Sequence, residues 1–542
     1  MTDHASVAIP PVHASHRNES PRGLSDTTCR WWLAAIVITV TVVNVLYLGL
    51  NCPIDLSGDE AQYWEWSRRL DLSYYSKGPL VAYVIRASTS LLGDTAFAVR
   101  LPAVVIYAGV TIGLYAVARR AFQSDRVALA TVVMAQATPI FLFYSVAMTI
   151  DTPLILCWTW ATYFALRAVH DGARWPWIIA GALTGVGFLA KYAALLWWVG
   201  VPLFAALSAS GRARIRWGWA IAGFALALAC TSPVWVWNAQ HDWVSFRHVA
   251  KQTGASGGSI YRGNFFEFVA SQVGVANPAV FGLIVAAAGW TWTRGRGNRD
   301  ANHAVPATLL LAVGGAFFAL TAVVSLFAKV QTNWPGPAYV TLIPLAAAYL
   351  LRSADWRRWR GVVAAGVAIG LGAHVIGREP AIVLRPLKAL GLPDSRIAWI
   401  DGISRLRGWR ALGERVGQEA GQLGPDTFIL CDSYMQTALM AFYVPGRPTT
   451  FYAGSYFTRP SRLTQYDQWT DRRLDQPHLL GRNAVYVGKG GPMPEPLPGA
   501  FERVEKLPEI PVRAGGVVVE TFKVWRCWGF KGLRRPDAPR SY

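Results

Sequence analysis

The sequence predicts a mainly α-helical protein that crosses a membrane about eleven times and ends in an α/β domain outside the membrane. Three observations support this fold class. Only 15% of the 542 residues are charged and 53% are hydrophobic, whereas about 25% of the residues in an average soluble protein are charged. The apolar residues form long runs that are separated by short loops rich in Arg. Residues 378–542 lack any run of the roughly 17–25 residues that a spanning helix needs.

The apolar runs follow one another from the N-terminus. Residues 1–30 are rich in Ser, His and Pro, and we expect a disordered cytoplasmic tail. A transmembrane domain is expected over 31–377, with a long extracytoplasmic loop at 51–94. No small-residue cleavage site follows the first apolar run, so we expect that run to remain as a span. The predicted spans are 32–50, 95–118, 127–147, 151–169, 176–190, 192–208, 218–237, 266–290, 306–327, 337–351 and 361–377.

The charges of the loops decide how these spans are oriented. The fifth and sixth spans are short, and joining them into one helix would invert the topology of everything that follows. With a cytoplasmic N-terminus and separate spans, every second connection is basic, as loops retained in the cytoplasm usually are. The opposite face then carries the loops 51–94 and 238–265 and everything after residue 377. We expect the function on this face.

The net charge of +20 reflects the same basic loops. Because the Arg residues lie mainly in short loops between apolar runs, they suit membrane orientation better than a groove for nucleic acid. No nucleic-acid partner is expected.

Residues 378–542 predict a small extracytoplasmic α/β domain. The segments 428–430, 485–487 and 516–519 favour strands, and 433–443 favours a helix. Cys431 and Cys527 fall in this domain, where they either form a disulfide or remain two free thiols. None of the six cysteines belongs to a CxxC pair, which argues against a zinc site.

A carboxylate pair, Asp59-Glu60, follows the first span. Sugar transfer with inversion needs a carboxylate to take the acceptor's proton. A carboxylate pair can also bind a divalent cation that balances a phosphate. Taken alone, an ordinary solvated acidic loop is the simpler interpretation of the pair.

Two further groups flank apolar segments on the same predicted face. Lys77 follows Tyr75 at the start of a segment, 78–85, that predicts an interfacial helix. A cation there can hold a lipid phosphate at headgroup depth, or it can extend to the interface without a specific partner. Asp151 lies between two apolar runs, where an acid is costly unless it faces a polar cavity. It can also cap the helix that Pro153 begins.

The remaining candidates are cations. Lys191 interrupts an apolar stretch, and Lys329 precedes the tenth span. Arg262 belongs to the loop 238–265, whose aromatic residues suit sugar stacking and whose glycines suit a mobile lid. Each of these cations has an alternative role as an interfacial anchor.

The shared placement of these groups is more informative than any one of them. A polyprenyl-phosphate sugar needs a hydrophobic groove for its lipid, cations for its phosphate and a carboxylate for the incoming hydroxyl. A flippase or transporter should instead carry polar groups near the bilayer midplane and show internal repeats. The middles of the predicted spans are apolar and no repeat is visible, which favours an enzyme over a transporter.

Several motifs resemble those of the GT-C glycosyltransferases, with the aminoarabinose transferases of lipid A and the protein O-mannosyltransferases as the nearest kin. These motifs are Asp59-Glu60 with Tyr63, Lys77-Gly78-Pro79-Leu80, Ala98-Val99-Arg100-Leu101-Pro102, Asp151-Thr152-Pro153-Leu154, Phe188-Leu189-Ala190-Lys191, Lys329 before Asn333-Trp334-Pro335, and Ala441-Phe442-Tyr443-Val444-Pro445-Gly446. The likeness covers most of the chain.

The resemblance implies a multi-pass enzyme of the bacterial inner membrane that takes a sugar from a polyprenyl-phosphate carrier. The acceptor would be lipid A, the lipopolysaccharide core or a protein. Asp59 would be the catalytic base with Glu60 in support, and Asp151 would line the same cavity. Lys77 would lie near the carrier phosphate, and Tyr75, Lys191, Arg262 and Lys329 are further candidates for substrate binding.

Three departures from the aminoarabinose transferases leave the sugar open, and one of them is a lower number of predicted spans. Gln62 stands where aminoarabinose transferases often have Arg, and Lys77-Gly78-Pro79 stands in place of Lys-Pro-Pro. Hexuronic acids and hexoses are therefore equally compatible with the sequence.

Overall fold

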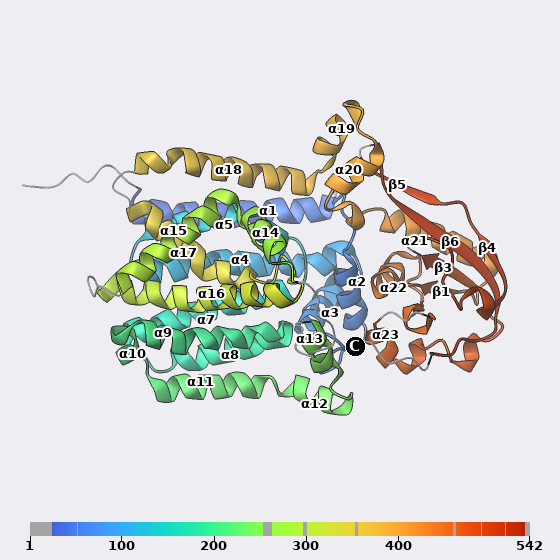
Figure 1. Ribbon diagram of the computed structural model, residues 1–542, viewed down its shortest axis with the longest axis horizontal. Coiled ribbons are helices and arrows are strands. Elements are labelled where there is room, and N and C mark those ends of the chain that lie inside the picture. Colours follow the sequence, from blue (N-terminus) through green and yellow to red (C-terminus); the bar gives the residue numbers. More distant parts are fainter. Residues whose placement is uncertain are drawn as a thin grey trace, which may run out of the picture.

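The computed structural model describes residues 24–50, 52–252, 263–295, 301–352, 356–458, 462–488, 490–514 and 516–536. Within these ranges, apolar helices lie side by side in a bundle, and a domain that contains a β-sheet packs against one end of it (Figure 1). Arg262 lies outside the described residues.

The bundle combines long and short helices. Its long helices are α1 (Asp26–Leu50), α4 (Ala96–Phe122), α7 (Asp151–Asp171), α16 (Ala301–Phe327) and α18 (Trp356–Arg378). The shorter ones are α5 (Asp125–Gln136), α6 (Pro139–Tyr144), α8 (Pro176–Ala190), η1 (Tyr192–Val199), α9 (Gly200–Leu207), α10 (Ala209–Arg214), α11 (Trp217–Cys230), α12 (Ser232–Gln240), α14 (Phe265–Ala276), α15 (Pro278–Gly295) and α17 (Gly336–Arg352). Because α1 begins at Asp26, the expected N-terminal tail is shorter than predicted by at least five residues.

Among the described residues, fewer helices are long and apolar enough to cross a membrane than the sequence predicts spans. Among the described residues, five helices are long and apolar enough to cross a membrane, or six if α14 and α15, which meet at 107°, form one span. Helices occupy all eleven predicted ranges, but several are interrupted, as α5 and α6 are before Pro139. A multi-pass membrane protein is therefore supported, and the count of eleven stays a prediction.

The chain reverses at Lys191, as the loop charges favoured. Helix α8 ends at Ala190, and Lys191 has an extended backbone (φ −148°, ψ 127°) before η1 begins. Figure 1 shows α10 at the end of the bundle opposite α13 (Val244–Gln252). The fifth and sixth predicted spans are therefore separate helices.

Three short helices lie at the junction between the bundle and the sheet domain (Figure 1). Helix α2 (Gly58–Ser67) begins with a capping box in which Ser57 and Glu60 bond each other's backbone. Helix α3 (Leu80–Leu92) starts two residues after the predicted 78 and continues past 85. Its 13 residues are too few to cross a bilayer. The third helix is α13.

The terminal domain is a mixed sheet flanked by helices. Its strands are β1 (Phe428–Cys431), β2 (Thr450–Tyr452), β3 (Ala484–Gly488), β4 (Phe501–Lys506), β5 (Ile510–Ala514) and β6 (Val517–Phe530), in the order β2-β1-β3-β6-β4 with β5 paired to β6. Its helices are α19 (Ala381–Ala389), α20 (Asp394–Ile400), α21 (Trp409–Leu423), α22 (Tyr434–Tyr443) and α23 (Gln465–Gln468), with short 3-10 turns at Ser404–Leu406, Gly454–Tyr456, Thr470–Arg472, Pro477–Leu479 and Pro498–Ala500. The predicted strands correspond to β1, β3 and β6, and the predicted helix to α22.

The sheet order settles the two open possibilities for Cys431 and Cys527. Strand β3 pairs with both β1 and β6, so the two cysteines lie two strands apart. Two strand spacings amount to about 10 Å, and a disulfide needs Cα atoms within about 7 Å. Both thiols are free, as are the other four.

The first loop and the sheet domain share one hydrophobic core. Trp64 of α2 packs edge-on against Phe442 of α22, with ring centroids 4.8 Å apart. The same cluster of buried side chains includes Ile85 of α3, Ile429 of β1 and Val524 of β6. The terminal domain is therefore fixed over the helices that carry the candidate site.

Candidate active site

Glu60 is a buried carboxylate that holds the loop before α2 in place. It accepts hydrogen bonds from Nε and Nη2 of Arg100, both at 2.8 Å. The backbone N–H groups of Ser57 and Met148 also donate to it, at 2.9 and 3.2 Å. Burial alone would raise the pKa of Glu60, but Arg100 and these hydrogen bonds lower it. Glu60 is therefore an ionised anchor.

Asp59 has a different environment although it is the adjacent residue. Its side chain is exposed to solvent. Within the described chain, its carboxylate has neither a hydrogen-bond partner nor an ion-pair partner. Crowding by protein raises its pKa, against the opposing effect of Lys77 and Arg462. A side chain that is crowded by protein and still reached by solvent has oxygens available to a ligand, and we call the surroundings that Asp59 shares with Lys77 the recess.

Lys77 lies near Asp59 and is also without a counter-ion among the described residues. Its carbonyl accepts hydrogen bonds from Ser73 Oγ and Tyr74 N, at 3.3 and 3.1 Å, which fixes the turn before α3. Burial and the nearby Lys191 lower the pKa of Lys77 to about 8.

Asp151 lies in the same cluster and is fully paired. Lys191 Nζ donates to its Oδ1 and Asn333 Nδ2 to its Oδ2, both at 2.7 Å. The alternative role as a helix cap is wrong, because Asp151 is the first residue of α7 and Ile150 stands at the cap position. The acid therefore joins three segments of the bundle at the site.

The structure thus brings together four of the predicted site residues: Asp59, Lys77, Asp151 and Lys191. Tyr75 lies beside them, with its ring 5.2 Å from that of His248. Lys329 is exposed in the turn before α17 and makes no hydrogen bond or ion pair with a described residue.

A metal site at Asp59 and Glu60 does not fit these contacts. Both oxygens of Glu60 already accept bonds from Arg100. In the ranges that the structure describes, no three His, Cys, Asp or Glu side chains gather as metal ligands would. The residues present do not form a cation site at the pair, and the requirement for a divalent cation stays a prediction.

Two residues of the sheet domain join the site without having been identified from the sequence. The guanidinium of Arg462 lies over the ring of Tyr434, 4.8 Å from its centroid, and both residues interact electrostatically with Asp59. No sequence signal marked them, because a charged or aromatic residue is unremarkable in a domain outside the membrane.

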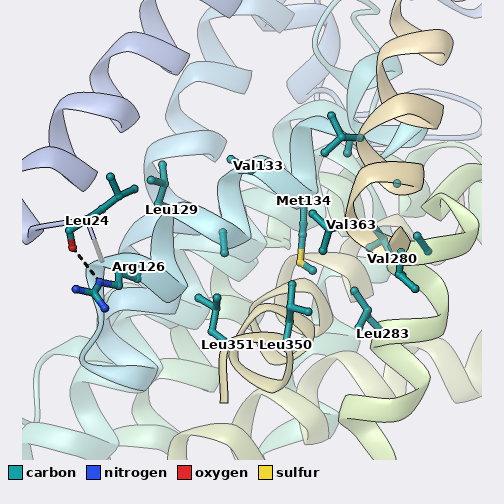
Figure 2. Close-up of a pocket in the computed structure, with 16 residues that line it drawn as sticks. Leu24, Arg126, Leu129, Val133, Met134, Val280, Leu283, Leu350, Leu351 and Val363 are labelled. Carbon is teal, nitrogen blue, oxygen red and sulfur yellow. Dashed lines mark hydrogen bonds between the residues drawn. The ribbon is translucent and has the colours of Figure 1, made fainter. Parts of the chain in front are cut away.

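A separate cavity of about 330 Å³ lies among α5, α15, α17 and α18 and contains none of the predicted site residues (Figure 2). Its walls are apolar side chains such as Val133, Leu283 and Val363. The guanidinium of Arg126, at its edge, donates to the Leu24 carbonyl at 2.9 Å. Such a lining offers no group for acid–base chemistry.

Comparisons with known proteins can now be set beside this geometry. Residues 76–237 match the family model described as dolichyl-phosphate-mannose-protein mannosyltransferase. The chain is 31% identical over 324 residues to the lipid A galacturonosyltransferase RgtD of Rhizobium johnstonii. The matched segment covers 58% of this chain and 65% of the relative. The matched part thus spans just under two thirds of that relative.

The fold comparison covers almost the whole chain. The crystal structure of ArnT from Cupriavidus metallidurans bound to undecaprenyl phosphate matches with a TM-score of 0.62 and 17% identity, over 93% of this chain and 98% of that one. The apo state of the same protein matches with a TM-score of 0.57 and 15% identity, over 92% and 98%. Together, the ArnT-like fold and the sequence likeness to RgtD and the mannosyltransferase model confirm that this chain resembles the GT-C glycosyltransferases.

Proposed function

We propose that this chain is a GT-C glycosyltransferase that moves a sugar, with inversion, from a polyprenyl-phosphate carrier to an acceptor outside the cytoplasm. The observation that carries this proposal is that Asp59 and Lys77 lie near each other beside an apolar helix bundle, and that neither side chain bonds to a residue the structure describes. The enzyme would lie in a bacterial inner membrane, with the recess and the sheet domain on the periplasmic side.

Asp59 would act as the base. The acceptor hydroxyl attacks the anomeric carbon, and Asp59 takes its proton as the new C–O bond forms. The bond from the anomeric carbon to the phosphate oxygen breaks on the opposite face, and its electron pair leaves with the polyprenyl phosphate. The raised pKa of Asp59 suits this role, because a base accepts a proton more readily as its pKa approaches the working pH.

Lys77 would hold the phosphate. Lys77 lies in the turn where the start of α3 meets the end of α8, a place at which a carrier lipid would bring its phosphate to the amine. A cation there stabilises the charge that develops on the leaving phosphate. The ion pair between Asp151 and Lys191 would border the site without a direct part in proton transfer.

The acceptor we favour is lipid A or the lipopolysaccharide core. The relative that matches over 324 residues is named for lipid A. A protein acceptor is the second candidate, because the matching family model is described by protein mannosylation. Purified enzyme offered lipid A or an unstructured Ser/Thr-rich peptide, with the same donor, separates the two by the mass of the product.

The test of the function is Asp59→Asn, which keeps the size of the side chain and removes its basicity. We expect kcat to fall by about 10²–10⁴-fold, the range of general-base catalysis. Transfer would be followed by mass spectrometry, with detergent-purified protein, polyprenyl-phosphate sugars and lipid A.

The matched control is Asp426→Asn, an exposed carboxylate of the sheet domain that should have no effect on kcat. Gel filtration would check that both variants remain folded. Turnover of Asp59→Asn at the rate of the unaltered enzyme would contradict the assignment of the base. Carrier lipid flipped across proteoliposomes without sugar transfer would favour a flippase instead.

A further inference from the structure

The segment that follows the last long helix of the bundle carries large apolar side chains that no described part of the chain covers. Leu390 is 76% exposed and Trp399 is 86% exposed, and Ile382 and Ile400 are about half exposed. These residues belong to α19, to the turn after it and to α20, and the two helices pack against each other. Apolar side chains scattered singly are ordinary on a protein surface, but a group of them on adjacent elements indicates an interaction site. We call residues 381–400 the foot.

Helix α19 has three faces of different character. Leu384 is buried in the hydrophobic core of the sheet domain. Ile382 and Pro386, four residues apart, lie on an exposed apolar face, and Arg385 and Lys388, three apart, lie on an exposed charged face. Exposed apolar and basic faces side by side are typical of a helix that lies in the interface of a membrane.

The charges of the foot favour an anionic neighbour. From residue 379 to residue 400, the charged residues are Glu379, Arg385, Lys388, Asp394 and Arg396. Both acids are engaged within the chain. Glu379 accepts from the N–H of Ala381 at 3.2 Å, and Asp394 accepts from Lys388 and from the N–H of Val518, the latter at 3.0 Å. Arg385 and Arg396 are exposed and make no hydrogen bond or ion pair with a described residue.

Helix α18 brings the foot to the membrane surface. Trp359–Arg378 is a candidate span, and only 11% of its most apolar stretch is buried inside the protein, so most of it faces lipid. Two residues separate Arg378 from Ala381, so α19 begins at most about 10 Å from the end of the span. The exposed Leu371 of α18 is thus followed, across this short link, by the exposed Ile382. Figure 1 shows α19 beyond the end of α18 and standing out to the side of the bundle, over the area that surrounding lipids would occupy.

The foot is also fixed to the rest of the protein. Leu384 of α19 and Ile397 of α20 belong to the same buried cluster as Trp64 of α2. The core of the sheet domain and the end of α18 therefore hold the foot from two sides, and its exposed face cannot turn away from the membrane without unpacking that core.

We propose that the foot is a membrane-contact surface that rests on the anionic phospholipids of the leaflet facing the sheet domain. Leu390 and Trp399 lie at headgroup depth, where tryptophan is preferred. Arg385 and Arg396 lie against the lipid phosphates. The contact holds the sheet domain, and the helices packed beneath it, at a fixed height over the leaflet. This inference needs a membrane-spanning α18 and does not rest on the proposed glycosyl transfer.

Spin labels on single cysteines measure this contact in the full-length protein. The partly exposed Cys52 and Cys230 would first be replaced by Ser. Leu390→Cys and Trp399→Cys would then carry a nitroxide, with one protein copy in each nanodisc of phosphatidylcholine and phosphatidylglycerol. Oxygen, which concentrates in lipid, and a nickel chelate, which stays in water, relax the label according to its surroundings. We expect the ratio of oxygen to nickel accessibility at both foot positions to exceed the ratio in the sheet domain away from the membrane.

Two other exposed leucines give the limits of the scale. Leu371→Cys, on the lipid-facing side of α18, should give the highest ratio. Leu480→Cys should give the lowest, because the next residue, Gly481, bonds to Phe530, at the end of β6 opposite to that where Val518 holds α20. Foot ratios equal to that of Leu480→Cys would overturn the proposal. Foot labels shielded from both agents would indicate a protein partner and would overturn it as well.

The preference for anionic lipid has its own test. Omitting phosphatidylglycerol should lower the ratio at Trp399→Cys. Replacing both arginines, Arg385→Gln with Arg396→Gln, should cause the same loss when phosphatidylglycerol is present and no further loss without it. Arg534→Gln, which removes an exposed arginine after β6, is the matched control and should leave the ratio unchanged. Equal ratios with and without phosphatidylglycerol would overturn the anionic headgroup as the partner of the foot.

Discussion

Asp59 and Glu60 are consecutive residues whose surroundings give them different chemistry. Arg100, 40 residues along the chain, occupies both oxygens of Glu60 and also donates to the carbonyls of Ile54 and Asp55. That network fixes the loop and α2, and it leaves Asp59 to face the recess. Removing one partner of a buried ion pair leaves an uncompensated charge, so Glu60 and Arg100 must both be present for the loop to keep its shape. Glu60 therefore contributes to the site by holding the loop in place.

The pH dependence of donor use should report on Lys77. Because its pKa is lowered to about 8, the free enzyme loses this positive charge as the pH rises through that value. The phosphodiester of the donor does not titrate there, so kcat/KM should fall on the alkaline side. In Lys77→Arg the cation persists, and we expect that alkaline fall to disappear up to about pH 10, because a guanidinium stays protonated.

The measurement is kcat/KM for the donor from about pH 5 to pH 10, which reports groups of the free enzyme. The fall on the acidic side, where Asp59 takes up a proton, serves as the internal control. The raised pKa of Asp59 places that fall above the ordinary range for a carboxyl group, and it should persist in both enzymes. Identical alkaline falls in both enzymes would exclude Lys77 as the titrating group.

The residues that the sequence identified share one property. Lys77, Asp151 and Lys191 interrupt or flank apolar runs, where a charge is expensive without a reason, and they lie on the same predicted face as the carboxylate of Asp59. Arg462 could not be found in this way, because charged side chains are common in a domain that water surrounds. The role of Glu60 as an anchor depends on Arg100, a contact that the spacing of residues does not reveal.

At the level of elements, the meeting of α3 with α8 explains one departure from the family pattern. A Cβ on Gly78 would lie 2.2 Å from the carbonyl oxygen of Leu189, far inside contact distance. Only glycine lets the turn that carries Lys77 approach the end of α8, two residues before Lys191. The chain places both lysines at one recess through this contact.

Gly78→Ala should therefore damage both stability and donor binding. The backbone of Leu189 cannot move as a flexible side chain would, so we expect a loss of about 1–3 kcal/mol in the free energy of unfolding, as for other overpacked sites. The displaced Lys77 should raise KM for the donor. Thermal unfolding in detergent and initial rates against donor concentration measure the two effects.

Gly372→Ala is the matched control, because it lies within α18 and nothing approaches its Cβ position within 4 Å. It should leave KM unchanged and stabilise the helix slightly, since alanine has the higher helix propensity. Equal stabilities and equal KM values for the two variants would show that the approach of Gly78 to Leu189 is not needed.

At the scale of the whole molecule, the sequence predicted the helical ranges better than their continuity. Apolar runs show where helices form, but the single predicted range 266–290 did not show the 107° bend between α14 and α15, which lies at Asn277 (φ 71°) before Pro278. The sequence also predicted a terminal α/β domain without showing where it sits. Trp64 and Phe442 lie hundreds of residues apart, and nothing in either segment alone reveals that they share a core.

The orientation of that domain remains a prediction from loop charge, and cysteine labelling can test it. Four of the native cysteines are buried, so replacing the partly exposed Cys52 and Cys230 by Ser should leave little labelling of native thiols. Leu480→Cys adds an exposed thiol in the sheet domain, and Ala213→Cys adds one in α10, at the opposite end of the bundle (Figure 1).

A membrane-impermeant maleimide added to cells with a permeabilised outer membrane should label Leu480→Cys before lysis and Ala213→Cys only after it. This follows because Arg212 and Arg214 flank position 213, and basic loops stay on the cytoplasmic side. The reverse pattern would place Asp59 and Lys77 in the cytoplasm. An enzyme in that orientation would meet its carrier at the inner leaflet, and a periplasmic acceptor would be out of reach.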